Sequence, residues 1–174
     1  MDNELYRLGE EVGAALKAGN LVLTTAESCT GGWIGEVVTM ISGSSAWYDR
    51  GFITYTNAAK QQMLCVKAAT LREHGAVSEP VVREMAAGAL AASGAQIAVS
   101  VSGVAGPTGG TPEKPVGTVC IGWARKGGAA GAAAGVDTHA ETCRFQGDRE
   151  AVRRQSVVRA LRRVLELAGG HRLA

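Results

Sequence analysis

The chain has 174 residues, of which 46% are apolar, and its net charge at pH 7 is +2. This length fits one domain, whose core is large enough to need no disulfide or metal for stability. No apolar run approaches the roughly 20 residues of a membrane-spanning helix, and the amphipathic N-terminus is unlike a signal peptide. We therefore expect one soluble, cytoplasmic domain over residues 1–174, with its core at about 5–165 and a tail at 169–174.

Helices and strands are predicted to alternate along the first part of the chain. Apolar periodicity predicts a first helix that ends at Gly19, a buried strand at 21–26 and a helix at 33–41. A strand at 51–55 follows, and Asn57 is expected to cap a short helix at 58–64. Ser78 is expected to cap a longer helix that ends at Gly94, before a strand at 96–102.

The remaining chain favours two strands and one helix. The runs 116–124 and 141–145 are typical of an antiparallel pair, and the Ala/Gly-rich segment between them predicts a mobile loop at about 126–140. An apolar stripe from Val157 to Ala168 indicates a final helix, whose arginines we interpret as a solvated face rather than a nucleic-acid contact. The order of elements predicts an α/β fold, a three-layer α/β/α domain with a mixed sheet of about five to six strands.

The four cysteines show no spacing typical of a metal site. Cys29, Cys65, Cys120 and Cys143 form no C-x-x-C pair, and no histidine lies near them. We therefore expect no metal and no cofactor.

Two glycine-bearing loops follow predicted strands, and both are candidate ligand sites. These loops are "ESCTGG" (27–32) and "SGVAGPTGG" (102–110). Ligands of open α/β sheets bind where strands end, and glycines leave backbone amides accessible. The shared position favours a small anionic ligand, although each loop alone is also compatible with simple turn chemistry. The candidate binding residues are Ser28, Thr30, Gly31, Gly32, Ser102, Gly103 and Gly106.

A third stretch, "GSSAWYDRGFITYTNAAK" (43–60), carries a possible catalytic set without a histidine. A serine needs a base to act as a nucleophile, and a neutral lysine can replace histidine in that role. Lys60 falls in the first turn of a predicted helix, where the positive end of the helix dipole lowers a lysine pKa. The alternative interpretation is structural: a serine caps a turn, Tyr55 is a core residue and Lys60 is solvated. Cys29 is the rival nucleophile.

Five motifs resemble the C-terminal domain of the competence/damage-inducible protein CinA family, over about residues 5–165. They are "TTAESCTGG", "GSSAWYDRGFITYTNAAK", "HGAVSEPVVREMA", "SVSGVAGPTGG…KPVGTVCIGWA" and "FQGDREAVRRQ". The resemblance implies hydrolysis of the carboxamide of nicotinamide mononucleotide to nicotinate mononucleotide and ammonia. It also implies a serine–lysine pair assisted by a tyrosine.

The resemblance assigns roles to individual residues. Carried over by motif, Ser45 is the nucleophile, Lys60 the general base and Tyr55 the assisting residue. Ser28, Ser102 and Arg149 are implied to surround the substrate, and we expect Arg149 to anchor its phosphate. The expected partner is this small nucleotide, with no membrane or nucleic acid, in a homo-oligomer. The alternative function is a non-catalytic nucleotide-binding or regulatory module linked to competence or DNA damage.

Overall fold

The computed structural model describes residues 2–127 and 135–173. Its centre is a five-stranded sheet in the order β2-β1-β3-β4-β5. The strands are β1 (Leu23–Glu27), β2 (Tyr48–Ile53), β3 (Ile97–Gly103), β4 (Thr118–Lys126) and β5 (Val136–Arg144). β1 pairs in parallel with both β2 and β3, whereas β4 is antiparallel to β3 and to β5. The predicted mixed sheet and its terminal antiparallel pair are confirmed.

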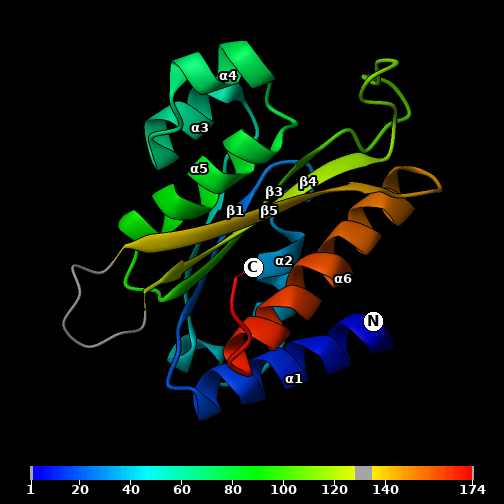
Figure 1. Cartoon of the computed structure of the whole chain (residues 1–174). Coiled ribbons are helices and arrows are strands. Elements are labelled where there is room, and N and C mark those ends of the chain that lie inside the picture. The colour runs from blue at the N-terminus through cyan, green and yellow to red at the C-terminus, as the bar shows by residue number, and fades with distance from the viewer. Residues whose placement is uncertain (1, 128–134, 174) are drawn as a thin grey trace.

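Helices cover both faces of the sheet and complete the three layers (Figure 1). One face carries α1 (Asn3–Ala18), α2 (Trp33–Thr39) and α6 (Arg149–Ala168); the other carries α3 (Asn57–Leu64), α4 (Ala68–His74) and α5 (Glu79–Ala91). Each face has its own apolar core, because the buried strands present aliphatic side chains on both sides. In the described part of the chain, no helix is long and apolar enough to cross a membrane.

The packing of α5 against α3 requires a glycine. A side chain on Gly88 of α5 would overlap the backbone carbonyl of Leu64, the last residue of α3. The two helices therefore approach each other more closely than any residue with a Cβ would allow. This close approach fixes the position of α3, which carries Lys60.

Several predicted boundaries differ from the structure. β2 ends at Ile53, so Tyr55 lies in the following loop, and the Thr56 hydroxyl caps α3 by accepting from the Ala59 amide in place of Asn57. The helix α4 was not predicted. Residues 136–140, predicted within a mobile loop, belong to β5, where they pair with β4. Lys126, also predicted within that loop, ends β4, and residues 128–134 of the loop lie outside the described residues.

Candidate active site

The ends of β1, β2 and β3 border a pocket of about 240 Å³. These strands are parallel, so their C-terminal ends share one edge of the sheet, where α/β proteins bind ligands. The loop before α5 and the start of α6 complete the wall. The lining residues are Ser28, Cys29, Tyr55, Asn57, Lys60, Ala76, Val77, Ser102, Gly103, Ala105 and Arg149.

Lys60 lies at the bottom of this pocket, with only 1% of its surface exposed. Its Nζ is 3.0 Å from the Ser28 Oγ, 2.8 Å from the Thr54 carbonyl oxygen and 3.4 Å from that of Tyr55. No carboxylate forms an ion pair with it in the part of the chain that the structure describes. Burial therefore lowers the pKa of the Lys60 ammonium, because neutral hydrogen-bond acceptors replace its hydration without supplying a negative charge.

Ser28 faces Lys60 because it directly follows β1. Its amide donates to the Val101 carbonyl, so the residue extends the β1–β3 pairing by one position. Gly31 and Gly32 then adopt positive φ angles, +62° and +101°, which turn the chain into α2. The preceding carboxylate of Glu27, which is buried, accepts hydrogen bonds from the amides of Gly32, Ile34 and Gly35 at 2.9–3.1 Å. Ser28 is thus held between a strand and an anchored helix start.

The structure does not bring Ser45 to Lys60, which corrects the pairing carried over by motif. Ser45 is exposed in the 3₁₀ turn Ser44–Ala46, which precedes β2, whereas Lys60 follows β2. The carbonyl of Trp47, next to this turn, accepts from the amide of Leu23 at the start of β1. The six residues of β2 separate the two ends by about 20 Å. The serine beside Lys60 is Ser28.

The rival nucleophile, Cys29, also lines the pocket. Its side chain is 7% exposed, and burial raises the pKa of its thiol to about 12. A thiol needs its thiolate form to attack a carbonyl carbon, and this form is scarce at neutral pH when the pKa is so high. Ser28 is no more acidic than this thiol, but its hydroxyl contacts the Lys60 amine, so the geometry of the pocket favours Ser28 over Cys29.

Tyr55 and Arg149 form the rim of the pocket. Tyr55 is 59% exposed, so it is not a core residue. Its hydroxyl accepts a hydrogen bond from Arg149 Nη2 at 3.1 Å, while Arg149 Nη1 donates to the Gly106 carbonyl at 2.8 Å. Arg149 is the first residue of α6, and it joins the loops after β2 and β3. The cation is thereby fixed over the entrance.

The other predicted binding residues divide between two adjacent hollows. Ser102 and Gly103, at the end of β3, line the pocket that contains Lys60. Thr30, Gly31 and Gly32 line a neighbouring hollow, together with Arg149. Gly106 contributes its carbonyl to Arg149. Both glycine loops therefore lie at the same edge of the sheet, as the sequence predicted.

Sequence reasoning assigned no site role to several pocket residues. Asn57, Ala76 and Val77 also line the pocket, and Glu27 holds the loop that carries Ser28. Ala76 and Val77 fall within the motif "HGAVSEPVVREMA", which carried the resemblance but was given no chemical role. No group of three metal-binding side chains occurs among residues 2–127 and 135–173.

Comparison with known proteins identifies relatives of this chain. The family model described as the CinA C-terminal domain matches residues 5–168. The chain is 57% identical to the nicotinamide-nucleotide amidohydrolase PncC of Escherichia coli K12, over 92% of each chain. It is 55% identical to the protein of the same name from Enterobacter agglomerans, over 94% of this chain and 95% of the relative. A crystal structure of competence damage-inducible protein A from Klebsiella pneumoniae superposes with a TM-score of 0.87 at 40% identity, covering 97% and 99% of the two chains.

Proposed function

Because the chain belongs to the CinA C-terminal domain family, we propose that it is a nicotinamide-nucleotide amidase. It hydrolyses the carboxamide of nicotinamide mononucleotide and releases nicotinate mononucleotide and ammonia. The names of the PncC relatives support the class of reaction and the nucleotide substrate. The observation that carries the proposed mechanism is the contact between the Ser28 Oγ and the Nζ of a buried Lys60.

In this mechanism Ser28, in place of Ser45, is the nucleophile and Lys60 is its base. A neutral amine has two N–H groups and one lone pair. The carbonyls of Thr54 and Tyr55 lie where they accept the two N–H groups, which leaves the lone pair for the Ser28 hydroxyl proton. Burial favours this neutral form. The lysine environment thus matches what a base for serine requires.

The reaction then proceeds in two steps, formation of an ester on Ser28 and hydrolysis of that ester. The Ser28 Oγ attacks the carboxamide carbon while its proton passes to Lys60, and the resulting ammonium returns that proton to the departing nitrogen. Ammonia leaves and an ester joins Ser28 to the nicotinoyl group. A water molecule, deprotonated by Lys60, attacks the ester, which releases the carboxylate and restores the Ser28 hydroxyl. No metal takes part in these steps.

The remaining site residues bind and orient the substrate. We assign the pyridine ring to the wall formed by Ala76 and Val77, because an aromatic ring needs apolar contacts. We assign to Ser102, which lines the pocket at the end of β3, a hydrogen bond donated to the carboxamide. The Tyr55 hydroxyl orients Arg149 by accepting its hydrogen bond, and these two side chains form the entrance of the pocket. The cytoplasmic location and the homo-oligomer stay predictions.

The deciding experiment mixes the purified protein with nicotinamide mononucleotide and follows ammonia and nicotinate mononucleotide together. We expect both products in equal amounts, with no change when a chelator is added. The competing function, a non-catalytic nucleotide-binding module, predicts binding in a calorimetric titration but no ammonia. Binding without turnover would therefore replace the proposal with that alternative.

A further inference from the structure

The arginines of α6 fall into two groups according to their partners. Four of them pair with carboxylates at 3.1 Å or less: Arg154 with Asp2 and Glu4, Arg159 with Glu141, Arg162 with Glu4 and Arg163 with Glu166. The other two, Arg149 and Arg153, form no ion pair with any residue that the structure describes. Both face the same hollow. An arginine without a carboxylate partner is available to an external anion.

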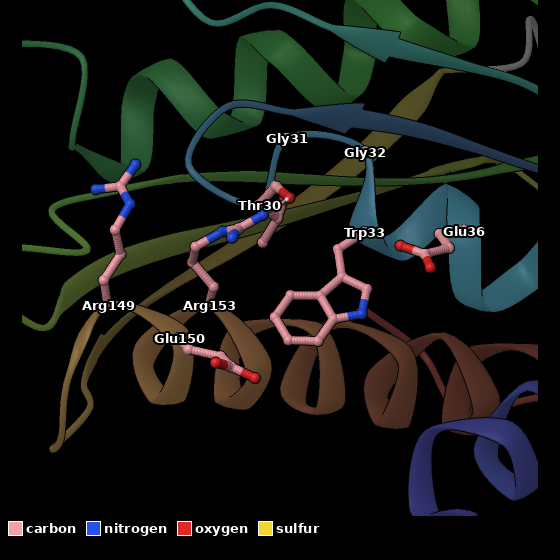
Figure 2. Close-up of a pocket in the computed structure, with 8 residues that line it drawn as sticks. All are labelled: Thr30, Gly31, Gly32, Trp33, Glu36, Arg149, Glu150 and Arg153. Atoms are coloured by element: carbon pink, nitrogen blue, oxygen red, sulfur yellow. Dashed lines mark hydrogen bonds between the residues drawn. The ribbon is translucent and has the colours of Figure 1, made fainter. Parts of the chain in front are cut away.

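This hollow, which we call the arginine groove, has a volume of about 540 Å³. Figure 2 shows the residues that line it. The loop 30–33 forms one side of the groove, and the first turns of α6 form the other. Arg149 lines both the groove and the Lys60 pocket. A ligand that reaches past Arg149 therefore occupies both spaces.

Arg153 is held in a fixed orientation inside the groove. Its Nε donates to the Cys29 carbonyl at 3.0 Å, its Nη2 donates to the Thr30 carbonyl at 2.9 Å, and its guanidinium lies 5.3 Å from the centre of the Trp33 ring. A guanidinium has five N–H groups, so these two bonds leave three donors for a ligand. Because Trp33 and the carbonyls already order the side chain, little conformational entropy is lost when an anion binds.

The positive charges lie at one end of the groove. In Figure 2, Arg149 and Arg153 rise next to each other from α6, whereas Glu36 lies beyond Trp33, on the far side from both arginines. Glu150 projects from α6 below them. A dianion is therefore attracted to the end of the groove that adjoins the Lys60 pocket. Glu150 opposes this attraction.

We propose that the arginine groove binds the 5′-phosphate of the substrate, and that Arg153 makes the enzyme prefer a nucleotide over the corresponding nucleoside. This inference rests on the function proposed above. In a nucleotide the ribose separates the base from the phosphate, so the phosphate must lie beside the pocket that holds the carboxamide. A phosphate monoester carries about −1.5 to −2 charges at pH 7 and suits the planar fork of a guanidinium.

The test compares two substrates that differ only in the phosphate, nicotinamide mononucleotide and nicotinamide riboside. The measured quantity is the ratio of their kcat/KM values. For Arg153→Gln we expect this ratio to fall by about 10- to 100-fold, since a charge-assisted hydrogen bond to a phosphate is lost. If kcat/KM falls by the same factor for both substrates, Arg153 only positions the loop of Ser28 and the proposal is overturned.

Two further variants control for folding and for general charge effects. Arg154→Gln removes the next arginine of α6, which pairs with Asp2 and Glu4 outside the groove, and should leave the ratio unchanged. Glu150→Gln removes a negative charge from the groove and should raise the ratio. A ratio that responds equally to Arg154→Gln and Arg153→Gln, or that falls in Glu150→Gln, would contradict the phosphate assignment.

A binding measurement separates this inference from the proposed function. Wild type that releases no ammonia from either substrate would refute the amidase function. Calorimetric titration with ribose 5-phosphate and with ribose still tests the groove in that case. We expect wild type to bind the phosphorylated sugar more tightly than ribose, and Arg153→Gln to lose most of this difference. Equal affinity of wild type for both sugars would overturn the groove assignment.

Discussion

The turns that carry Ser28 and Ser45 look alike in sequence but differ in the structure. Each contains glycine with a positive φ angle, Gly31 and Gly32 in one and Gly43 in the other. Ser28 is 8% exposed and contacts a buried lysine, whereas Ser45 is exposed to solvent. The difference arises because Ser28 follows β1 and Ser45 precedes β2, and these strands run parallel. The end of the strand that a serine occupies decides its burial and its neighbours here, more than the motif around it does.

Removing each hydroxyl separately tests the difference between the two serines most directly. We expect Ser28→Ala to lower kcat by at least ~10³-fold, because the attacking oxygen is lost. The kcat of Ser45→Ala should stay within about twofold of wild type, since Ser45 is exposed and precedes β2, at the end of the strand away from the pocket. Ammonia release under single-turnover conditions measures the activity of both variants, and thermal unfolding shows whether each variant is still folded. The reverse order of effects would restore Ser45 as the nucleophile.

The second prediction concerns Lys60, the proposed base, which lies beside Ser28 and not beside Ser45. Lys60→Arg keeps a positive charge but cannot be neutral near pH 7, so kcat should fall by about 10²- to 10⁴-fold. In wild type, burial lowers the Lys60 pKa, so the active neutral form increases as pH rises. The kcat/KM of wild type should therefore rise with pH and reach a plateau below the ~10.4 of a free lysine.

A pH series on wild type and on Lys60→Arg checks this assignment. The rising limb should be absent from whatever activity the variant retains. If Lys60→Arg keeps most of its kcat, the lysine supplies charge only and another group removes the proton. Such a result would also remove the main chemical difference between the surroundings of Ser28 and Ser45.

The smallest expected effect comes from the rim of the Ser28 pocket. Tyr55→Phe removes the hydroxyl that accepts from Arg149 Nη2 but keeps the backbone carbonyl near Lys60. We expect kcat/KM to fall by about three- to tenfold, mostly through KM, because one hydrogen bond of the entrance is lost. Steady-state kinetics separate the two constants. A fall in kcat above a hundredfold would show that the hydroxyl transfers a proton instead.

Most of the fold could be predicted because its signals are local. Apolar runs and periodicity indicated five strands and five of the six helices. The helix α4 was missed because Leu71 is its one buried residue, so it has no apolar stripe. The length of β5 was underestimated because only one residue of this edge strand, Ala140, is buried, and its first residues border an Ala/Gly-rich segment.

The contacts of the site were harder to predict because they join distant segments. Ser28 and Lys60 are 32 residues apart, whereas Ser45 is closer in sequence, and the motif grouped Ser45 with Lys60. One signal could have corrected this grouping. A helical run separates the first two strands, and such a crossover makes neighbouring strands parallel. Parallel strands place Ser28 and Lys60 at one edge and Ser45 at the other.

The glycine at position 88 shows how a residue remote from the chemistry can control it. Gly88 lets the end of α3 pack against α5 at a distance that no side chain would permit. The lysine sits one helical turn before that contact, at the fourth residue of α3. Even the smallest enlargement, a single methyl group on Gly88, would therefore push α3 outward and withdraw the amine from the serine. Such a change would be selected against because it lowers turnover, although Gly88 touches no substrate.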